Sequence, residues 1–173
     1  MKMMDSQTLR SSQAPLKAKY KEHPETALVT HHAEATLGEN ITAEVRTKHS
    51  DIVAGLHPAA GGSGEDICSG DMLLEALAAC AGVTMNAVAT AMGIHLRSAK
   101  VVADGEIDFR GTLGVSKEVP VGFKNIRLVF DLDTDAPAEQ IASLIKLTER
   151  YCVVFQTLKS PPEISVSVKS VPL

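Results

Sequence analysis

Apolar and polar residues alternate along several short stretches of the chain, and a period of two is typical of half-buried β-strands. The alternation is clearest in residues 101–109 (VVADGEIDF), 124–133 (KNIRLVFDLD) and 163–171 (EISVSVKSV). Residues 26–37 (TALVTHHAEATL) and 41–56 (ITAEVRTKHSDIVAGL) predict two or three further antiparallel strands.

Two stretches follow the period of a helix instead. Residues 72–94 are apolar nearly all round, with Ser69 as the expected N-cap and Gly93 as the expected stop signal. A second helix is expected to begin near Asp135, with Pro137 in its first turn. The order strands, long helix, strands, helix, strand predicts an α+β protein whose helices pack on antiparallel sheets.

The long apolar helix admits two interpretations, a membrane span and a buried core helix. Its length would suffice to cross a bilayer. However, it is interrupted by Glu75, Thr84, Asn86 and Thr90, and no second span or aromatic belt accompanies it. A helix that is apolar on all sides is usually buried on all sides, and one other helix is too little to cover it. We therefore expect no membrane span and a homodimer in which the partner covers one face.

Length and composition indicate one domain with an appended arm. The chain has 173 residues, and we divide it into a polar N-terminal arm (1–25) and one domain (26–173). A net charge of −4 and the absence of Trp argue against nucleic-acid binding. The arm carries a surplus of basic residues, and we interpret it as solvated or docked on a partner subunit. Its charged residues are Lys2, Arg10, Lys17, Lys19 and Lys21 against Asp5, Glu22 and Glu25.

The first residues contain no apolar stretch long enough for a signal peptide, so we expect a cytoplasmic protein. Three cysteines are too few for a disulfide framework and fit a reducing compartment. No spacing typical of a metal site is present, and the adjacent His31 and His32 would point to opposite faces of a strand. No metal or organic cofactor is expected.

The three cysteines are the candidate reactive groups. Cys80 lies in the middle of the long helix, Cys152 at the end of the second helix, and Cys68 in the loop before the long helix. A buried cysteine can simply act as a small apolar side chain. Because the helix dipole fades after the first turn, a reactive Cys80 would need a cation from elsewhere in the fold. The sequence permits Cys80 and Cys152 to meet between two helices, but it does not show that they do.

Five segments together resemble one known family. They are residues 68–84 (CSGDMLLEALAACAGVT), 93–96 (GIHL), 101–111 (VVADGEIDFRG), 119–123 (VPVGF) and 147–158 (LTERYCVVFQTL). Over about residues 26–169 the chain resembles the superfamily of osmotically inducible protein C and organic hydroperoxide resistance proteins (OsmC/Ohr). Within it, the chain looks like an OsmC-like branch that carries an N-terminal extension.

The resemblance implies an intertwined homodimer with long central helices under sheets from both subunits. It also implies an antioxidant thiol peroxidase of the oxidative stress response. Cys80 would be the peroxidatic cysteine and Cys152 the resolving cysteine. The substrate would be a small organic hydroperoxide, the reductant a dithiol, and no cofactor would be needed.

The chain departs from the family pattern around the first cysteine. Well-characterised members carry a glutamate ten positions before it, where this chain has Gly70 followed by Asp71. They also carry an arginine on an early strand, for which Arg46 is the nearest candidate here. Arg150, two helical positions before Cys152, is expected to face elsewhere.

These departures leave two other functions open. One is a non-catalytic member of the fold that binds a small apolar ligand at the dimer interface. The other is a redox sensor whose disulfide changes shape for a partner instead of turning over.

Overall fold

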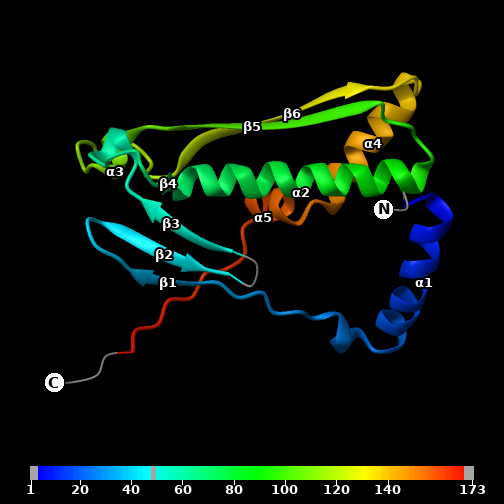
Figure 1. The fold of residues 1–173 in the computed structure, drawn as a ribbon, viewed down its shortest axis with the longest axis horizontal. Helices are drawn as coiled ribbons and strands as arrows, with labels where there is room; N and C mark the ends of the chain where they lie inside the picture. The colour runs from blue at the N-terminus through cyan, green and yellow to red at the C-terminus, as the bar shows by residue number, and fades with distance from the viewer. Residues whose placement is uncertain (1–3, 48–49, 170–173) are drawn as a thin grey trace.

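The computed structural model describes residues 4–47 and 50–169 as a set of helices and two separate sheets (Figure 1). The helices are α1 (Ser6–Glu22), α2 (Ser69–Met92), α3 (Phe109–Thr112), α4 (Ala138–Tyr151) and α5 (Val153–Lys159). Two short 3-10 turns cover Pro24–Ala27 and Pro58–Ala60. The strands are β1 (Glu34–Leu37), β2 (Thr42–Arg46), β3 (Asp51–Gly55), β4 (Ile67–Cys68), β5 (Ser98–Ile107) and β6 (Phe123–Asp133). The predicted α+β class is confirmed.

Helix α2 is the central element, and the long hairpin of β5 and β6 lies along one side of it (Figure 1). Both strands cover segments in which the sequence alternates. The helix ends as predicted at Gly93, whose left-handed backbone (φ 70°) lets its N–H reach back to the carbonyls of Ala89 and Thr90. It begins one residue earlier than expected, because Cys68 and not Ser69 occupies the N-cap.

The core lies between α2, the hairpin and the last two helices. The buried face of α2 carries Leu77, Ala81, Met85 and Ala89, which recur every fourth residue and so lie in one row. Leu144 of α4, which is fully buried, packs into the same core at the end near Met85 and Ala89. This row anchors α2 against its own chain and leaves the opposite face of the helix to other contacts.

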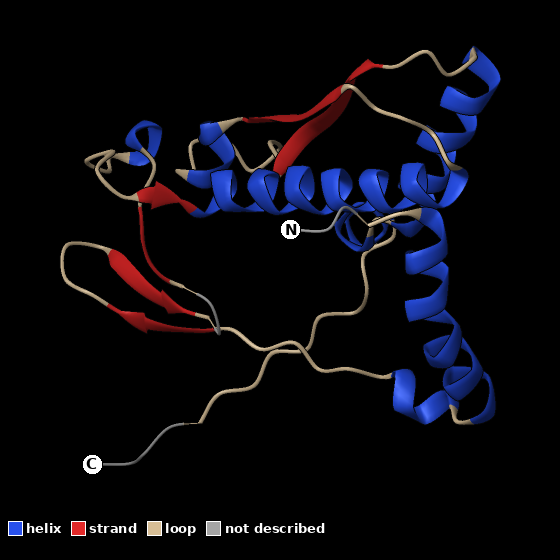
Figure 2. Cartoon of the chain, turned by 45° about the vertical axis from the view of Figure 1, so that its right-hand side comes forward, coloured by secondary structure: helices blue, strands red, loops and turns tan. Residues whose placement is uncertain are grey.

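The first four strands form a second, smaller sheet in the order β1-β2-β3-β4. The early stretches therefore form antiparallel strands as predicted, with β1 paired to β2 and β2 to β3, while β4 adds in parallel. The sheet joins α2 through β4, and the rest of it stands away from both α2 and the hairpin (Figure 2). Leu37 on the edge strand is 89% exposed.

The N-terminal arm is a helix, which the sequence analysis did not predict. Its N-cap is Asp5, whose carboxylate accepts a hydrogen bond from the N–H of Thr8 at 2.7 Å. Few apolar residues and an internal proline, Pro15, hide the helical period. Lys2 lies outside the described residues.

The predicted C-terminal strand is wrong for the residues that the structure describes. Residues 161–169 have no regular secondary structure and are exposed along their whole length. Alternation predicts a strand only where a neighbouring strand is present, and this segment pairs with neither sheet. Ile164, Val166 and Val168 are each more than 80% exposed. The last two residues of the predicted strand lie outside the described part.

Helix α2 is the one helix of the described residues with the length and hydropathy needed to cross a bilayer. It is also the helix on which the hairpin, α4 and α5 pack. Core helices of α+β proteins satisfy the same criteria.

Candidate functional site

Cys80 lies at the border between the two faces of α2. The buried row passes through Leu77 and Ala81, and the exposed side of the helix passes through Ala79 and Val83. Cys80 falls between them and is half-buried. Its sulfur is therefore shielded on one side by its own chain and lies beside the uncovered face of the helix on the other.

Cys152 ends the second helix, as predicted, and it occupies the break between α4 and α5. Its backbone is extended (φ −72°, ψ 107°), and it is at once the C-cap of α4 and the N-cap of α5. Its sulfur accepts a hydrogen bond from the N–H of Phe155 at 3.5 Å. The side chain is 1% exposed and packs against Leu77 and Ala81.

The fold brings the two thiols together, which the sequence only permitted. Cys80 packs against the buried cluster that contains Cys152, and each thiol shifts the pKa of the other. The break after Tyr151 makes this contact possible, because it turns the chain back toward α2 at the level of Cys80.

The environment of Cys80 favours its thiolate. Burial raises the pKa of this thiol, but hydrogen-bond donors outweigh burial, and the net pKa is lowered. In order of decreasing effect the donors are the N–H of Val154, the S–H of Cys152, the N–H of Val153 and the hydroxyl of Thr84. The stabilising groups are neutral dipoles, not the cation that the sequence analysis required.

The environment of Cys152 favours its protonated form. Burial is the main cause of its raised pKa, and the hydrogen bond to Cys80 and the charge of the Cys80 thiolate raise it further. The two thiols are thus unequal. Cys80 loses its proton first, whereas Cys152 stays protonated and acts toward Cys80 as a hydrogen-bond donor. Such a pair can attack an electrophile with one sulfur and close a disulfide with the other.

The charged residues named as candidate partners of Cys80 lie elsewhere in the chain. Arg46 is 68% exposed and lies within 4.0 Å of the carboxylates of Glu34 and Asp51 on the small sheet. Asp71 is exposed in the first turn of α2, about 14 Å before Cys80 along the helix axis. Within one chain, neither residue activates the thiol.

Two further expectations concern the flanks of the pair. Arg150 lines a surface pocket that neither thiol lines, and its guanidinium lies 5.5 Å from the ring centre of Tyr151. Cys68 is half-buried at the start of α2, about 18 Å before Cys80 along the helix axis, so it is not part of the pair.

The donors to Cys80 were not identified from the sequence. Thr84 lies one turn after Cys80, so the spacing of four residues could have revealed it. Val153 and Val154 contribute through their backbone N–H groups, which become available only because α4 stops at Tyr151. No side-chain signal marks this break.

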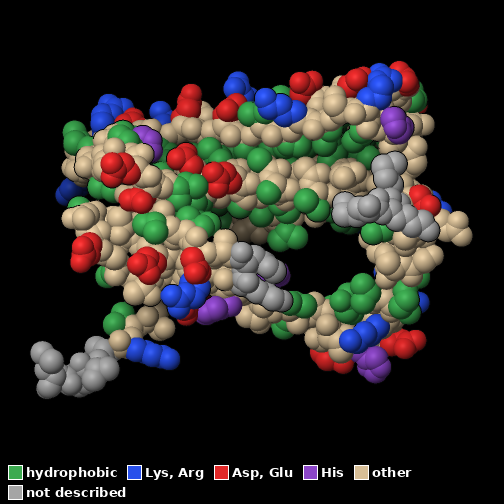
Figure 3. All heavy atoms as spheres, in the orientation of Figure 1, with side chains coloured by type: hydrophobic (Ala, Val, Ile, Leu, Met, Phe, Trp, Pro, Cys, Tyr) green, Lys and Arg blue, Asp and Glu red, His purple; other side chains and the backbone are tan. Residues whose placement is uncertain are grey.

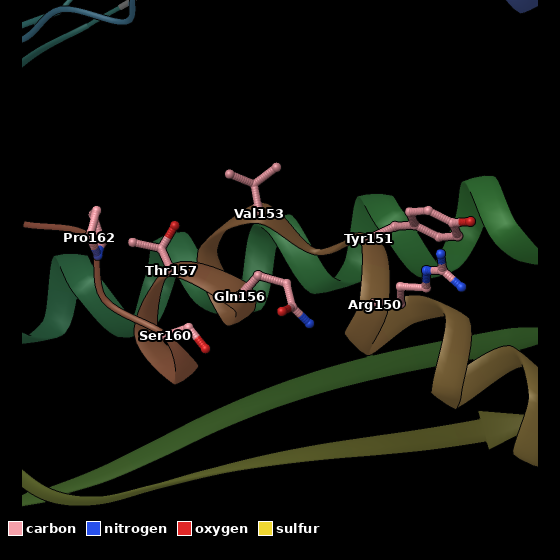
Figure 4. Close-up of a pocket in the computed structure, with 7 residues that line it drawn as sticks. All are labelled: Arg150, Tyr151, Val153, Gln156, Thr157, Ser160 and Pro162. Atoms are coloured by element: carbon pink, nitrogen blue, oxygen red, sulfur yellow. The ribbon is translucent and has the colours of Figure 1, made fainter.

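A shallow pocket of about 550 Å³ lies beside the pair, on the outer side of α4 and α5 (Figure 4). It is lined by Arg150, Tyr151, Val153, Gln156, Thr157, Ser160 and Pro162. Val153 is 71% exposed and Tyr151 57% exposed, so apolar surface lies open directly next to the buried Cys152. Neither thiol lines this pocket.

The described residues contain no group of three His, Cys, Asp or Glu side chains placed to hold a metal ion. His57 instead accepts a hydrogen bond from the N–H of Ala59 and stacks on Phe109 at 4.8 Å between ring centres.

Comparison with known proteins agrees with the geometry of the fold. Residues 62–167 match the family model described as OsmC-like protein. No curated protein sequence matches the chain significantly.

Several solved structures share the fold. An OsmC-like protein from Mycoplasma pneumoniae superimposes with a TM-score of 0.66 at 19% identity, over 77% of this chain and 89% of that one. An organic hydroperoxide resistance protein from Elizabethkingia anophelis gives a TM-score of 0.62 at 17% identity, over 78% and 91%. A similarly named protein, OsmC from Legionella pneumophila, gives 0.60 at 19% identity, over 77% and 91%. At these identities the likeness shows the fold.

The hydroxyl of Thr84 provides a direct test of the donor set. Thr84→Val should raise the pKa of Cys80, because the thiolate loses a donor while the volume of the side chain is kept. A thiolate reacts and a thiol does not, so the onset of reactivity toward iodoacetamide should move to higher pH. The rate at pH 7 should fall roughly fivefold to tenfold.

Thr84→Ser keeps the hydroxyl and is the matched control, for which the pH profile should stay near that of the wild type. Val153→Pro should shift the profile in the same direction as Thr84→Val, since it removes one N–H at the first position of α5, where proline is tolerated. Identical profiles for Thr84→Val and Thr84→Ser would rule out the hydroxyl as a donor.

Proposed function

The chain belongs to the OsmC family, and on that premise we propose that it is a thiol-dependent peroxidase that reduces organic hydroperoxides. The observation that carries the proposal is that Cys80 packs against the buried cluster that contains Cys152, with the pKa of Cys80 lowered and that of Cys152 raised. Two of the structural neighbours are named organic hydroperoxide resistance proteins, which supports the same chemistry.

The first step is attack of the Cys80 thiolate on the terminal oxygen of the hydroperoxide. An S–O bond forms and the O–O bond breaks, which leaves a sulfenic acid on Cys80. The departing alkoxide takes up one proton and leaves as the alcohol. The sulfur is oxidised by two electrons and the peroxide is reduced by two.

The second step uses Cys152. Its sulfur attacks the sulfenic sulfur of Cys80, so that an S–S bond forms, the S–O bond breaks and water leaves. An external dithiol then reduces the disulfide by thiol–disulfide exchange and is itself oxidised to a disulfide. Burial keeps Cys152 protonated until this step, which keeps it from competing for the peroxide.

Apolar surroundings favour an organic hydroperoxide over hydrogen peroxide. Val154, Phe155 and Leu158 of α5 pack around the core cluster that contains Cys152 and borders Cys80. An alkyl or aryl group can be buried against such side chains, whereas hydrogen peroxide has none to offer.

We also propose that the protein acts as a homodimer, because one chain exposes far more surface than a folded monomer. Its accessible surface is 13550 Å². A globular monomer of 18.4 kDa exposes about 8200 Å². The difference between these two areas is larger than the area that each chain of an obligate dimer normally buries, so a second copy could cover it.

The uncovered face of α2 is suited to that contact. It is formed by small and apolar or weakly polar residues at alternating spacings of four and three: Met72, Ala76, Ala79, Val83, Asn86 and Thr90. This spacing is that of a helix seam that packs on another helix. Cys80 lies beside the seam, so a partner helix would complete the shielding of its thiol.

The thiols require a reducing compartment, and we propose the cytoplasm, with a cytoplasmic dithiol as electron donor. In that setting the protein would act as an antioxidant in the oxidative stress response. The chemistry itself needs no metal or organic cofactor, since the electrons come from sulfur.

The proposal is tested by adding one equivalent of cumene hydroperoxide to the fully reduced protein and mapping the cysteines by mass spectrometry. We expect rapid formation of a disulfide between Cys80 and Cys152, and steady peroxide consumption once a dithiol is supplied. Disulfide formation without turnover would favour a redox sensor. If both thiols stayed reduced for hours, the peroxidase proposal would fail and a ligand-binding role would replace it.

A further inference from the structure

Helix α1 has one half that packs on α2 and one half that, in the described residues, contacts chiefly the 3-10 turn that follows it, Pro24–Ala27. At the first half, the guanidinium of Arg10 donates to the carbonyl of Ala91, at the end of α2, at 3.4 Å. Leu9 and Gln13, on the same part of the helix, are half-buried. Beyond this point α1 runs away from α2, and no residue of α1 is fully buried (Figure 1).

The packed face continues unchanged along the free half. Leu9, Gln13, Leu16 and Tyr20 recur at spacings of four, three and four, so they form one stripe along the helix. Leu16 is 48% exposed and Tyr20 is 38% exposed. Because α2 covers only the first half of this stripe, the second half is an apolar surface that another molecule could cover.

A row of cations runs beside this stripe. Arg10, Lys17 and Lys21 follow at spacings of seven and four, which places them on one flank of the helix. The rest of the molecule has the opposite charge. Residues 1–25 hold five basic and three acidic residues, and since the whole chain holds 17 and 21, the remainder holds 12 and 18.

The space beside the free half of α1 is open. Figure 3 shows an opening bounded by α2, α1 and the segment that connects α1 to β1 (residues 28–33). The connecting segment is exposed throughout, with Leu28 at 88% and Val29 at 65%. Helix α1 and the connecting segment therefore border a space that the described residues do not fill.

We propose that the free half of α1 docks on the body of a second copy of this chain, through the apolar residues Leu16 and Tyr20 and the flanking Lys17 and Lys21. This inference rests on the proposed dimer and extends it. The accessible surface in excess of that of a monomer is large enough for a second copy to cover. The acidic remainder of the chain complements the basic flank of α1. The apolar stripe also continues the contact of α1 with the end of α2, next to the seam. The arm thus clasps the partner.

The test is sedimentation equilibrium of the full-length protein over a range of concentrations, with two double variants. Leu16→Glu with Tyr20→Glu places charge in the free half of the stripe. The matched control, Ser11→Glu with Ala18→Glu, adds the same charge to the opposite, exposed side of α1. We expect the first variant to raise the dissociation constant of the dimer at least about tenfold and the control to leave it within about twofold.

Circular dichroism shows whether the helix content of both variants is unchanged. Because both variants add two glutamates to α1, an effect of charge on the helix would appear in both, whereas loss of the contact would appear only in the first. If the wild type is a dimer and both variants have the same dissociation constant, the docking of α1 is wrong while the dimer stands. If the wild type is a monomer, both are wrong. A second measurement is binding to phosphatidylserine vesicles. If the first variant loses vesicle binding while its dimer dissociation constant stays that of the wild type, the stripe binds a membrane surface and the proposal is overturned.

Discussion

Cys80→Ser should reduce the consumption of cumene hydroperoxide in the presence of a dithiol to the rate seen without protein. Serine has nearly the same shape as cysteine, but its hydroxyl does not ionise near neutral pH and forms no sulfenic acid. The donors that hold the thiolate, the N–H groups of Val153 and Val154, would then have no anion to stabilise. The measurement is steady-state peroxide loss, and the expected decrease is at least about a thousandfold.

Cys152→Ser separates the two steps of the same reaction. Without a resolving thiol, the protein should consume one equivalent of hydroperoxide and stop, with a sulfenic acid on Cys80 that dimedone traps. Its first equivalent should react at a rate within about tenfold of the wild type, because Cys152 contributes only one of the donors to Cys80. Equal turnover by Cys152→Ser and wild type would contradict the resolving role, and a dimedone adduct on Cys68 would contradict the assignment of Cys80.

Val83→Glu should separate the proposed dimer into chains. Val83 lies in the middle of the seam on α2, and its side chain is 73% exposed in one chain. In a dimer it would be buried, and burying an unpaired carboxylate costs several kcal/mol per ion. The dissociation constant should rise about a hundredfold or more, measured by sedimentation equilibrium.

Val115→Glu is the matched control, since Val115 is the same residue type with 71% exposure and lies in the loop after α3. If the protein is a single chain, each substitution should change the free energy of unfolding by no more than about 0.5 kcal/mol relative to the wild type. For a dimer through the seam, only Val83→Glu should have an effect. Equal behaviour of the two variants would therefore show that the seam is not an interface.

Most of the regular elements could be predicted from the sequence, because their patterns reflect local burial. The alternation in β5 and β6 and the apolar run of α2 each correspond to an observed element. The end of α2 at Gly93 was also predictable, since the left-handed backbone there suits glycine. Errors arose where a pattern needs a neighbour or lacks apolar residues, as in the C-terminal segment and in α1.

The candidate site could be predicted only in part. The family resemblance named Cys80 and Cys152, but the residues that act on Cys80 are absent from any motif. Thr84 is common in helices, and backbone N–H groups carry no sequence signal at all. The family pattern directed attention to charged residues, whereas Arg46 pairs with carboxylates on the small sheet.

By itself the sequence determined the fold class, the central helix and the hairpin, because hydrophobic periodicity is a local property of the chain. Only the tertiary structure decided that the two sulfurs meet and which of them is the more acidic. That outcome depends on the break at Cys152, which packing against α2 positions, and on the direction in which two backbone N–H groups then point. Hydrogen bonds and burial between residues 72 positions apart are properties of the folded chain, and no local pattern encodes them.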